Sequence, residues 1–262
     1  MNILHVLNGD ATLAGFEQTG LDGDVVVWRG VLSEGPLEEN IASAHFWKAR
    51  AEWVMIPFNE TAEGYQKNML NVLTKLGEPY DEINLWFEFD LHCQANLLGI
   101  MTYLSKQTNL SEPAVYLICP GEYPGKADFR GMGELNGEEL EYLYDNIRSR
   151  LSQMDFIIAV EAWNIYASRN ADLLSDYLNK TTFWASLHLL KPALQAQLKR
   201  LQVNDKGLNH IEQTLLNIYN SGITTKTEIH SAFWQTEKIY GMGDLEIDIY
   251  LSNLSAKGLI SL

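Results

Sequence analysis

The sequence of 262 residues contains only two cysteines, Cys93 and Cys119, and both lie among apolar neighbours. Two cysteines are too few for a disulfide framework or a four-ligand zinc site. No stretch reaches the roughly 18 consecutive apolar residues that a membrane-spanning helix needs. The first apolar run stops at Asn8-Gly9-Asp10 and has no basic segment before it, unlike a signal peptide. We therefore expect a cytoplasmic protein with buried thiols and no membrane contact.

Positive charge is scarce too, because 19 Lys and Arg stand against 34 Asp and Glu, for a formal net charge of -15. Nucleic acid phosphates attract Lys and Arg, so we expect no nucleic acid partner for this acidic protein. The sequence has no Walker motif, no Gly-x-Ser-x-Gly and no His-Glu-x-x-His. The Gly-x-Gly at Gly131 and Gly133 lacks the third glycine and the preceding strand of a dinucleotide site. The apolar fraction of 46% is that of a folded domain.

Short apolar runs alternate with helical periodicity over the first half of the chain. The runs cover residues 3–7, 25–28, 83–87 and 114–119, and the amphipathic segments between them cover 37–53, 62–76 and 91–105. This alternation is typical of βαβ units. It predicts an α/β fold whose N-terminal domain, residues 1–125, contains a parallel sheet.

The second half of the sequence is mostly helical. Residues 126–204 are expected to form a helical connector, with helices over 137–154, 155–168, 170–179 and 181–201 and a kink or boundary near Pro192. Residues 205–262 resemble a winged-helix module in layout, with helices over 211–219, 224–230 and 245–254 and a possible wing strand in 257–262. The module is acidic where a DNA reader is basic, which favours packing or protein contact. Trp163, Trp184 and Trp234 are expected to pack between helices.

Polar residues follow three of the predicted strands directly. In an open parallel sheet, ligands bind outside the carboxyl ends of the strands. If the strands are parallel, these residues face one crevice. The candidate ligand-binding residues are Asn8, Gly9, Asp10, Arg29, Ser33, Glu34, Glu88, Asp90, His92 and Gln94.

Glu88 and Asp90 carry the most specific expectation. Alternation in an extended chain places both carboxylates on one side, where they could share Mg²⁺ or Mn²⁺ together with Asp10. Paired acids can also raise each other's pKa and act as acid and base. The alternative is that Asp90 caps the following helix while Glu88 pairs with Arg29.

The other candidates have alternatives as well. The planar fork of Arg29 can clamp a carboxylate or a phosphate, or it can form an ion pair with Asp10, Glu34 or Glu88. Asp10 can cap a helix or hold a cation or hydroxyl group. Ser33 has no nucleophile-elbow context, so no nucleophilic role is predicted for it. His5 lies within a predicted strand and is expected to pack in the interior.

Three segments resemble a known family when taken together. They are Leu4-His-Val-Leu-Asn-Gly-Asp10, Trp28-Arg-Gly-Val-Leu-Ser-Glu-Gly-Pro36 and Leu85-Trp-Phe-Glu-Phe-Asp-Leu-His-Cys-Gln-Ala-Asn-Leu-Leu98. They resemble the bacterial domain-of-unknown-function family numbered 1835. Thr181-Thr-Phe-Trp184 and Gly241-Met-Gly-Asp244 are similar to the C-terminal half of its longer members. The resemblance implies a bacterial cytoplasmic protein in which the three strand-end segments form one site. It assigns no activity and no catalytic residue.

Two functions of different classes fit the sequence. The first is binding of a small anionic, phosphorylated ligand at the strand ends, or metal-assisted hydrolysis or transfer at phosphorus there. The alternative is a non-enzymatic regulatory or protein-interaction role for the helical and winged-helix-like C-terminal half. Its motivation is the three-part layout and the missing catalytic motifs.

Overall fold

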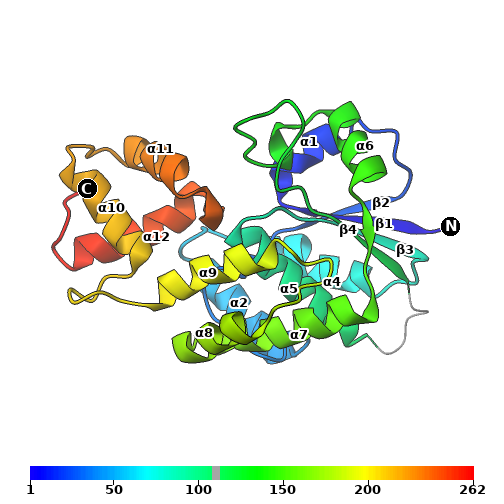
Figure 1. The fold of residues 1–262 in the computed structure, drawn as a ribbon, viewed down its shortest axis with the longest axis horizontal. Coiled ribbons are helices and arrows are strands. Elements are labelled where there is room, and N and C mark those ends of the chain that lie inside the picture. The colour runs from blue at the N-terminus through cyan, green and yellow to red at the C-terminus, as the bar shows by residue number, and fades with distance from the viewer. Residues whose placement is uncertain (108–112) are drawn as a thin grey trace.

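A five-stranded mixed sheet forms the centre of the computed structural model, which describes residues 1–107 and 113–262 (Figure 1). The strand order is β2-β1-β3-β4-β5, and the first four strands are parallel to one another. The short β5 runs antiparallel to β4, which corrects the expectation of a purely parallel sheet. The strands are β1 (Ile3–Asn8), β2 (Asp24–Trp28), β3 (Glu82–Trp86), β4 (Ala114–Ile118) and β5 (Ser149–Arg150).

Helices connect the strands and, apart from β5, make up the regular secondary structure of the second half. In the first half they are α1 (Leu13–Phe16), α2 (Ala44–Val54), α3 (Ala62–Tyr65), α4 (Asn71–Leu76) and α5 (Leu91–Ser105). The second half contains α6 (Gly137–Asn146), α7 (Gln153–Ser168), α8 (Ala171–Lys180), α9 (Leu190–Leu201), α10 (His210–Asn220), α11 (Lys226–Thr236) and α12 (Asp244–Ala256). Shorter helical turns are η1 (Asp10–Thr12), η2 (Gln66–Leu70), η3 (Met132–Glu134) and η4 (Lys238–Tyr240).

Strand residues alternate between two buried faces of the sheet. Leu7, Trp86 and Ile118 lie in register across β1, β3 and β4 and pack with α1 and α6. Their neighbours Leu4, Val6 and Leu85 belong to the larger core cluster on the opposite face. Figure 1 shows α1 and α6 on one side of the sheet and α2, α4, α5 and α7 on the other. Both faces are covered, as expected for a parallel sheet made of βαβ units.

The winding of the chain reverses between β1 and β3. From β1 the chain passes through α1 to β2 on one side, whereas β3 lies on the other side of β1 and leads on to β4. Connections that depart on opposite faces leave a crevice outside the carboxyl ends of the two central strands, and this is where ligands bind in open α/β sheets. The segments that begin with Gly9 and Phe87 flank this switch point.

Three predicted helix boundaries were wrong. The helix expected over 137–154 ends at Asn146, because Ser149 and Arg150 pair with β4 before Ser152 caps α7. The helix expected from residue 37 begins only at Ala44, where the Ser43 side chain accepts the Phe46 N–H. The helix expected over 181–201 begins only at Leu190. Pro192 lies in its first turn, where its missing N–H has no helical partner to lose, so of the two alternatives, a kink or a boundary, the boundary is confirmed.

The C-terminal segment contains the three expected helices. The tail 257–262 forms no strand within the described chain, so a wing is not confirmed. Trp163 and Trp184 pack in the core as expected, but the packing prediction was wrong for Trp234, which is 41% exposed. Its indole N–H donates to the carbonyl of Met242 at 2.8 Å. No helix of the described residues is long and apolar enough to cross a membrane.

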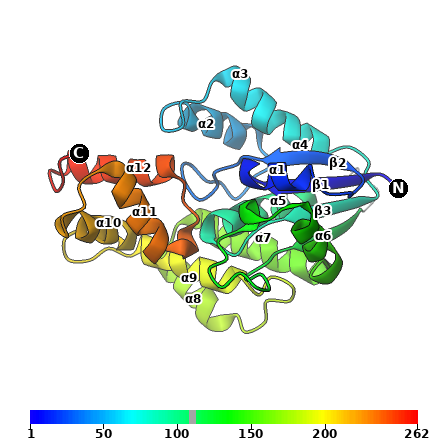
Figure 2. The ribbon, with the colours of Figure 1, turned by 90° about the horizontal axis from the view of Figure 1, so that it is seen from above.

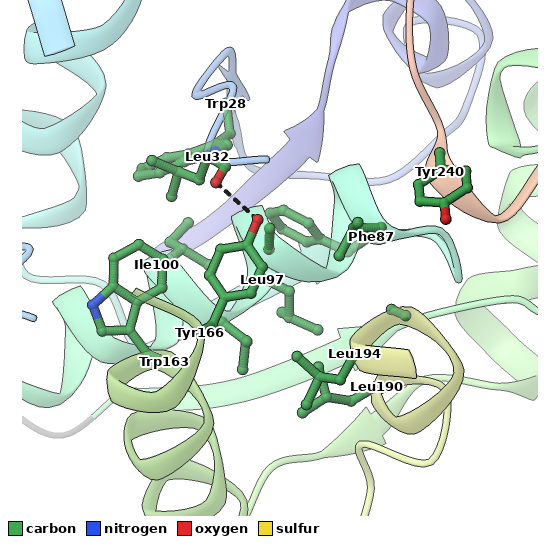
Figure 3. Packing of buried hydrophobic residues seen from close by; sticks show 14 of the residues in the cluster. Trp28, Leu32, Phe87, Leu97, Ile100, Trp163, Tyr166, Leu190, Leu194 and Tyr240 are labelled. Atoms are coloured by element: carbon green, nitrogen blue, oxygen red, sulfur yellow. Dashed lines mark hydrogen bonds between the residues drawn. The ribbon is translucent and has the colours of Figure 1, made fainter. Parts of the chain in front are cut away.

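The larger core cluster includes residues from both halves of the chain. Figure 3 shows Trp163 and Tyr166 of α7 against Ile100 of α5, and Tyr240 from η4 on the other side of Phe87; all belong to the same cluster. The Tyr166 hydroxyl donates to the carbonyl of Leu32 at 3.2 Å. The buried core therefore ties the segment after β2 to the helices of the second half.

Candidate functional site

An acid–thiol cluster lies at the switch point, immediately after β3. Ligand atoms of Glu88, Asp90 and Cys93 all lie within 4.8 Å of one another. Asp90 is 4% exposed and Cys93 is 5% exposed, while Glu88 is partly buried. Asp90 is also the N-cap of α5, because its Oδ1 accepts the Cys93 N–H at 2.9 Å. The capping alternative for Asp90 is thus observed, and one carboxylate oxygen remains for other partners.

Burial makes ionisation of the two acids unfavourable. Removal from water, reinforced by the neighbouring Asp90 charge, raises the pKa of Glu88 to about 8, although the Met132 N–H at 2.6 Å opposes the shift. Removal from water also raises the pKa of Asp90, against the opposing effect of His92. A bound cation would reverse this preference, because metal ligands release their protons on binding.

Amide side chains fix the surroundings of the cluster. Asn8, the last residue of β1, donates to the Cys93 sulfur at 2.9 Å and accepts from Asn96 at 2.9 Å. Gln94 donates to the Glu88 carbonyl at 2.6 Å. The structure therefore brings the predicted residues Asn8, Glu88, Asp90 and Gln94 together, with Cys93 and Asn96 added.

His92 and Ser33 meet a carboxylate from the far end of the chain. Oε1 of Glu246 on α12 lies 3.1 Å from His92 Nδ1 and 3.1 Å from Ser33 Oγ. Burial lowers the pKa of His92, but Glu246 outweighs it and the pKa is about 9. Ser33 and Glu246 both contact the same ring nitrogen, and Ser33 is 1% exposed. A nucleophilic triad needs one ring nitrogen for each partner, so this arrangement is a buried hydrogen-bonded junction.

Glu34 is part of the same junction with the second half of the chain. Its Oε1 accepts the Tyr250 hydroxyl at 3.0 Å and lies 3.0 Å from Arg200 Nη1, as an ion pair without hydrogen-bond geometry. Burial raises the pKa of Glu34, and Arg200 opposes the shift. The predicted ligand-binding roles of Ser33 and Glu34 remain predictions, but both side chains already have protein partners.

Guanidinium groups hold the backbone of the same loop. Arg50, which is 1% exposed, donates to the carbonyls of Val31 and Glu34. Arg169 donates to the carbonyl of Gly35, and Arg200 donates to that of Ser33 at 2.6 Å. These hydrogen bonds fix the backbone of the loop after β2. Its side chains, which contact α12 and α5, are therefore held in place.

Arg29 and Asp10 form a separate pair at the neighbouring strand ends. The guanidinium binds both carboxylate oxygens, with Nε–Oδ2 at 2.8 Å and Nη2–Oδ1 at 2.6 Å. The Asp10 side chain is 61% exposed and is not a member of the acid–thiol cluster. The ion-pair alternative for Arg29 is therefore observed with Asp10, and its alternative pairing with Glu88 is not. Gly9, at φ 92°, donates its N–H to the Trp28 carbonyl and links the two strand ends.

Two glycines allow the backbone to cover the buried acids. A Cβ at Gly131 would collide with the Glu88 carboxylate, and a Cβ at Gly241 would collide with that of Asp90. Gly131 precedes η3, whereas Gly241 follows η4 in the C-terminal segment. Asp90 is thus covered by chain from the other end of the sequence.

Comparison with known proteins adds no assignment to this geometry. No family model and no curated protein matches the chain. The function must therefore be argued from the residues themselves.

Sequence reasoning missed several residues of this region. Arg200, Glu246 and Tyr250 were not singled out, because no local pattern distinguishes them from ordinary helix residues. Gly241 was noted in a motif but was not connected with the strand ends. Cys93 was interpreted as a buried thiol and not as a possible metal ligand. The spacing Glu88-x-Asp90-x-x-Cys93 was the available signal.

Substitution of Gly241 by alanine is expected to lower the free energy of unfolding by about 2 kcal/mol more than Gly207→Ala. Both glycines have similar positive φ angles, 61° and 69°, so backbone strain is matched. Only at Gly241 does the new methyl group meet Asp90, since nothing lies within 4 Å of a Cβ at Gly207. Urea unfolding of both variants measures the difference. Equal losses would show that the close approach to Asp90 is unimportant.

Proposed function

We propose that this protein binds a divalent metal ion with Glu88, Asp90 and Cys93 and uses it to hold a small anionic ligand at the switch point. The observation that carries the proposal is the convergence of two carboxylates and a thiol within 4.8 Å. Both carboxyl groups have raised pKa values, as expected where a cation is needed to stabilise their charge. Asp10, predicted as a further ligand, is bound by Arg29 and is left out of this set.

The donor set distinguishes among metals. Mg²⁺ prefers six oxygen ligands in near-octahedral geometry, so of the two ions expected from the sequence Mn²⁺ suits these residues better. A thiolate ligand also suits Zn²⁺. When bound, such an ion would polarise an oxygen of the ligand or activate a water molecule.

The surrounding residues define what kind of ligand is held. Arg29 stands at the end of β2, two strands from Glu88, and offers a partly exposed guanidinium to an anion. Asn8 and Gln94 keep the cluster in place through their hydrogen bonds. We propose hydrolysis or transfer at phosphorus as the reaction class.

The test is thermal unfolding with Mn²⁺, Zn²⁺ and Mg²⁺, alone and with inorganic phosphate. At a hundredfold excess over the dissociation constant, a bound ion stabilises the native state by about 2.7 kcal/mol. Asp90→Asn and Glu88→Gln should abolish the shift in melting temperature. Asparagine is a good N-cap, so the first variant keeps its helix cap while it loses its charge.

Asp10→Asn is the matched control, because it removes a carboxylate at the same sheet edge but outside the cluster. It should leave the metal shift in place and should not weaken the effect of phosphate, because loss of the Asp10 charge frees the Arg29 guanidinium for an anion. An unchanged melting temperature with all three ions, or a full shift in Asp90→Asn, would contradict the proposal.

Two broader expectations belong to the same proposal. We propose kinship with the family numbered 1835 on the likeness of three segments, which meet in this structure where Asn8 contacts Cys93 and Ser33 contacts His92. The acidic composition and buried Cys93 support a cytoplasmic location.

The second candidate function is protein interaction through the C-terminal half, which has the helices but not the wing of a winged-helix module. It is favoured by Trp234 and Leu245, which are 41% and 43% exposed on α11 and α12. Stability that no metal ion or phosphate alters would turn the search toward this function.

A further inference from the structure

The C-terminal helices lie beyond the ends toward which the parallel strands run. Figures 1 and 2 show α10, α11 and α12 on the opposite side of the molecule from the N-terminus, where β1 begins. We call residues 208–262 the C-terminal cap. It contains these three helices and η4, and the chain enters it from α9 through residues 202–207.

The cap covers Asp90 of the acid–thiol cluster directly. The backbone at Gly241 is so close to Asp90 that a side chain there would collide with the carboxylate. The Glu246 carboxylate lies against Ser33, in the loop after β2, and against His92 on α5. With the cap in this position Asp90 is 4% exposed and Cys93 is 5% exposed, so a ligand cannot reach them without movement.

The interface between the cap and the rest of the chain is rich in buried polar groups. Its hydrogen bonds run from Tyr250 to Glu34 at 3.0 Å, from Ser33 to Glu246 at 3.1 Å and from Tyr240 to the Ala196 carbonyl at 3.4 Å. A buried charged contact loses hydration when it forms, so it stabilises an interface less than apolar packing of the same size. Apolar cap residues such as Tyr240, Met242 and Tyr250 also belong to the larger core cluster. Separation of the cap is therefore a sub-global opening that costs less free energy than unfolding of the whole chain.

The connection between α9 and the cap is an exposed turn held by Asn204, which bonds Gly207 and Leu208, so bending falls on the residues that flank this turn. Val203 is 66% exposed, and Gly207 has φ 69° with nothing near its Cβ position. A few residues between two elements can absorb the angle changes of a closing segment.

We propose that the C-terminal cap is a lid, and that the acid–thiol cluster becomes accessible only when the lid separates from Ser33, Glu34 and His92. The lid explains how a site built from buried groups can exchange its ligand. It also excludes water from the cluster when closed. The identity of the ligand that the lid admits rests on the proposed function. Opening of the lid can be tested without any metal.

The reporter is the native thiol of Cys93. All proteins carry Cys119→Ser, so that Cys93 alone reacts with a thiol reagent such as N-ethylmaleimide. Tyr250→Phe removes the hydroxyl that binds Glu34 across the interface. It should speed native-state modification of Cys93 about tenfold, the population change expected when one hydrogen bond to a charged acceptor is lost. Ser33→Ala removes the hydrogen bond to Glu246 by a change outside the cap, and it should also speed modification of Cys93.

Tyr219→Phe is the matched control, because the Tyr219 hydroxyl bonds Ser261 inside the cap. It should leave the modification rate unchanged. The rates in Tyr250→Phe should also be nearly independent of low urea concentrations, since lid opening exposes far less surface than unfolding. Equal rates in the two tyrosine variants, or a rate that rises with urea as steeply as global unfolding, would overturn the lid.

Addition of Mn²⁺ separates the lid from the metal site. If Tyr250→Phe speeds modification but Mn²⁺ does not protect Cys93 in any variant, the lid stands and the metal proposal fails. If Mn²⁺ protects Cys93 while the two tyrosine variants react equally fast, the metal proposal stands and the lid is wrong.

Discussion

Replacement of Arg200 by methionine is expected to lower the free energy of unfolding by about 3–5 kcal/mol. The guanidinium of Arg200 is the cation beside Glu34, and both side chains are at most 10% exposed. Without it the Glu34 carboxylate keeps only the Tyr250 hydroxyl, and the Ser33 carbonyl loses its donor. A buried charge without a counter-charge is among the most destabilising changes that one substitution can make. Urea unfolding at pH 7 measures the loss.

Two further variants distinguish a lost ion pair from lost packing. Glu34→Gln combined with Arg200→Met should be much less destabilising than the sum of the single variants, because no charge is left unpaired. Lys180→Met removes a cation from the exposed pair with Asp176 and should change stability by less than about 1 kcal/mol. If Arg200→Met is no worse than Lys180→Met, the junction at Glu34 does not stabilise the fold.

Stability without metal is expected to fall as the pH rises from about 5 to about 8. The pKa of Glu88 in the folded protein is about 8, above the ordinary 4.5, because burial and Asp90 disfavour its charge. The folded state therefore keeps a proton that the unfolded state releases, and each pH step between the two pKa values favours unfolding. The contribution of Glu88 is on the order of 4 kcal/mol over this window. Asp90 has a raised pKa and acts in the same direction.

Glu88→Gln should make this pH dependence shallower. Urea unfolding of both proteins with a chelator, at pH 5, 7 and 9, supplies the comparison. Part of the slope should remain, since the stabilisation from protonated His92 is also lost as the pH rises toward about 9. Excess Mn²⁺ should raise the stability of the parent protein most at pH 9, where it replaces the proton. Parallel curves for the parent and Glu88→Gln would show that Glu88 ionises freely.

Local sequence patterns predicted the strands of the sheet with useful accuracy. The runs at 3–7, 25–28, 83–87 and 114–119 each became a strand of the expected parallel sheet within a residue or two. Period-two alternation and a polar residue at the end of a run are local properties of the chain, so they can be recognised without knowledge of the fold. The helix predicted over 91–105 was confirmed at both ends because Asp90 provides a local N-cap.

Other elements depended on contacts that no local pattern reports. The two residues of β5 form a strand only because β4 presents an open edge to them. The same sequence in isolation continues a helical pattern, so the prediction over 137–154 failed. Trp234 was assigned to packing by residue type, yet its place on α11 leaves it partly exposed.

The candidate site shows the same division. The sequence by itself determined that Glu88, Asp90 and His92 follow a strand. From the acidic composition and the two cysteines it predicts no disulfide framework and no nucleic acid partner. Only the tertiary structure decided which partners these groups have. Asp10 pairs with Arg29, Ser33 and His92 bind Glu246, and the backbone at Gly241 covers Asp90. Residues separated by more than 150 positions meet through packing of the whole chain. Alternation and spacing depend only on the nearest few residues, so they cannot predict such contacts.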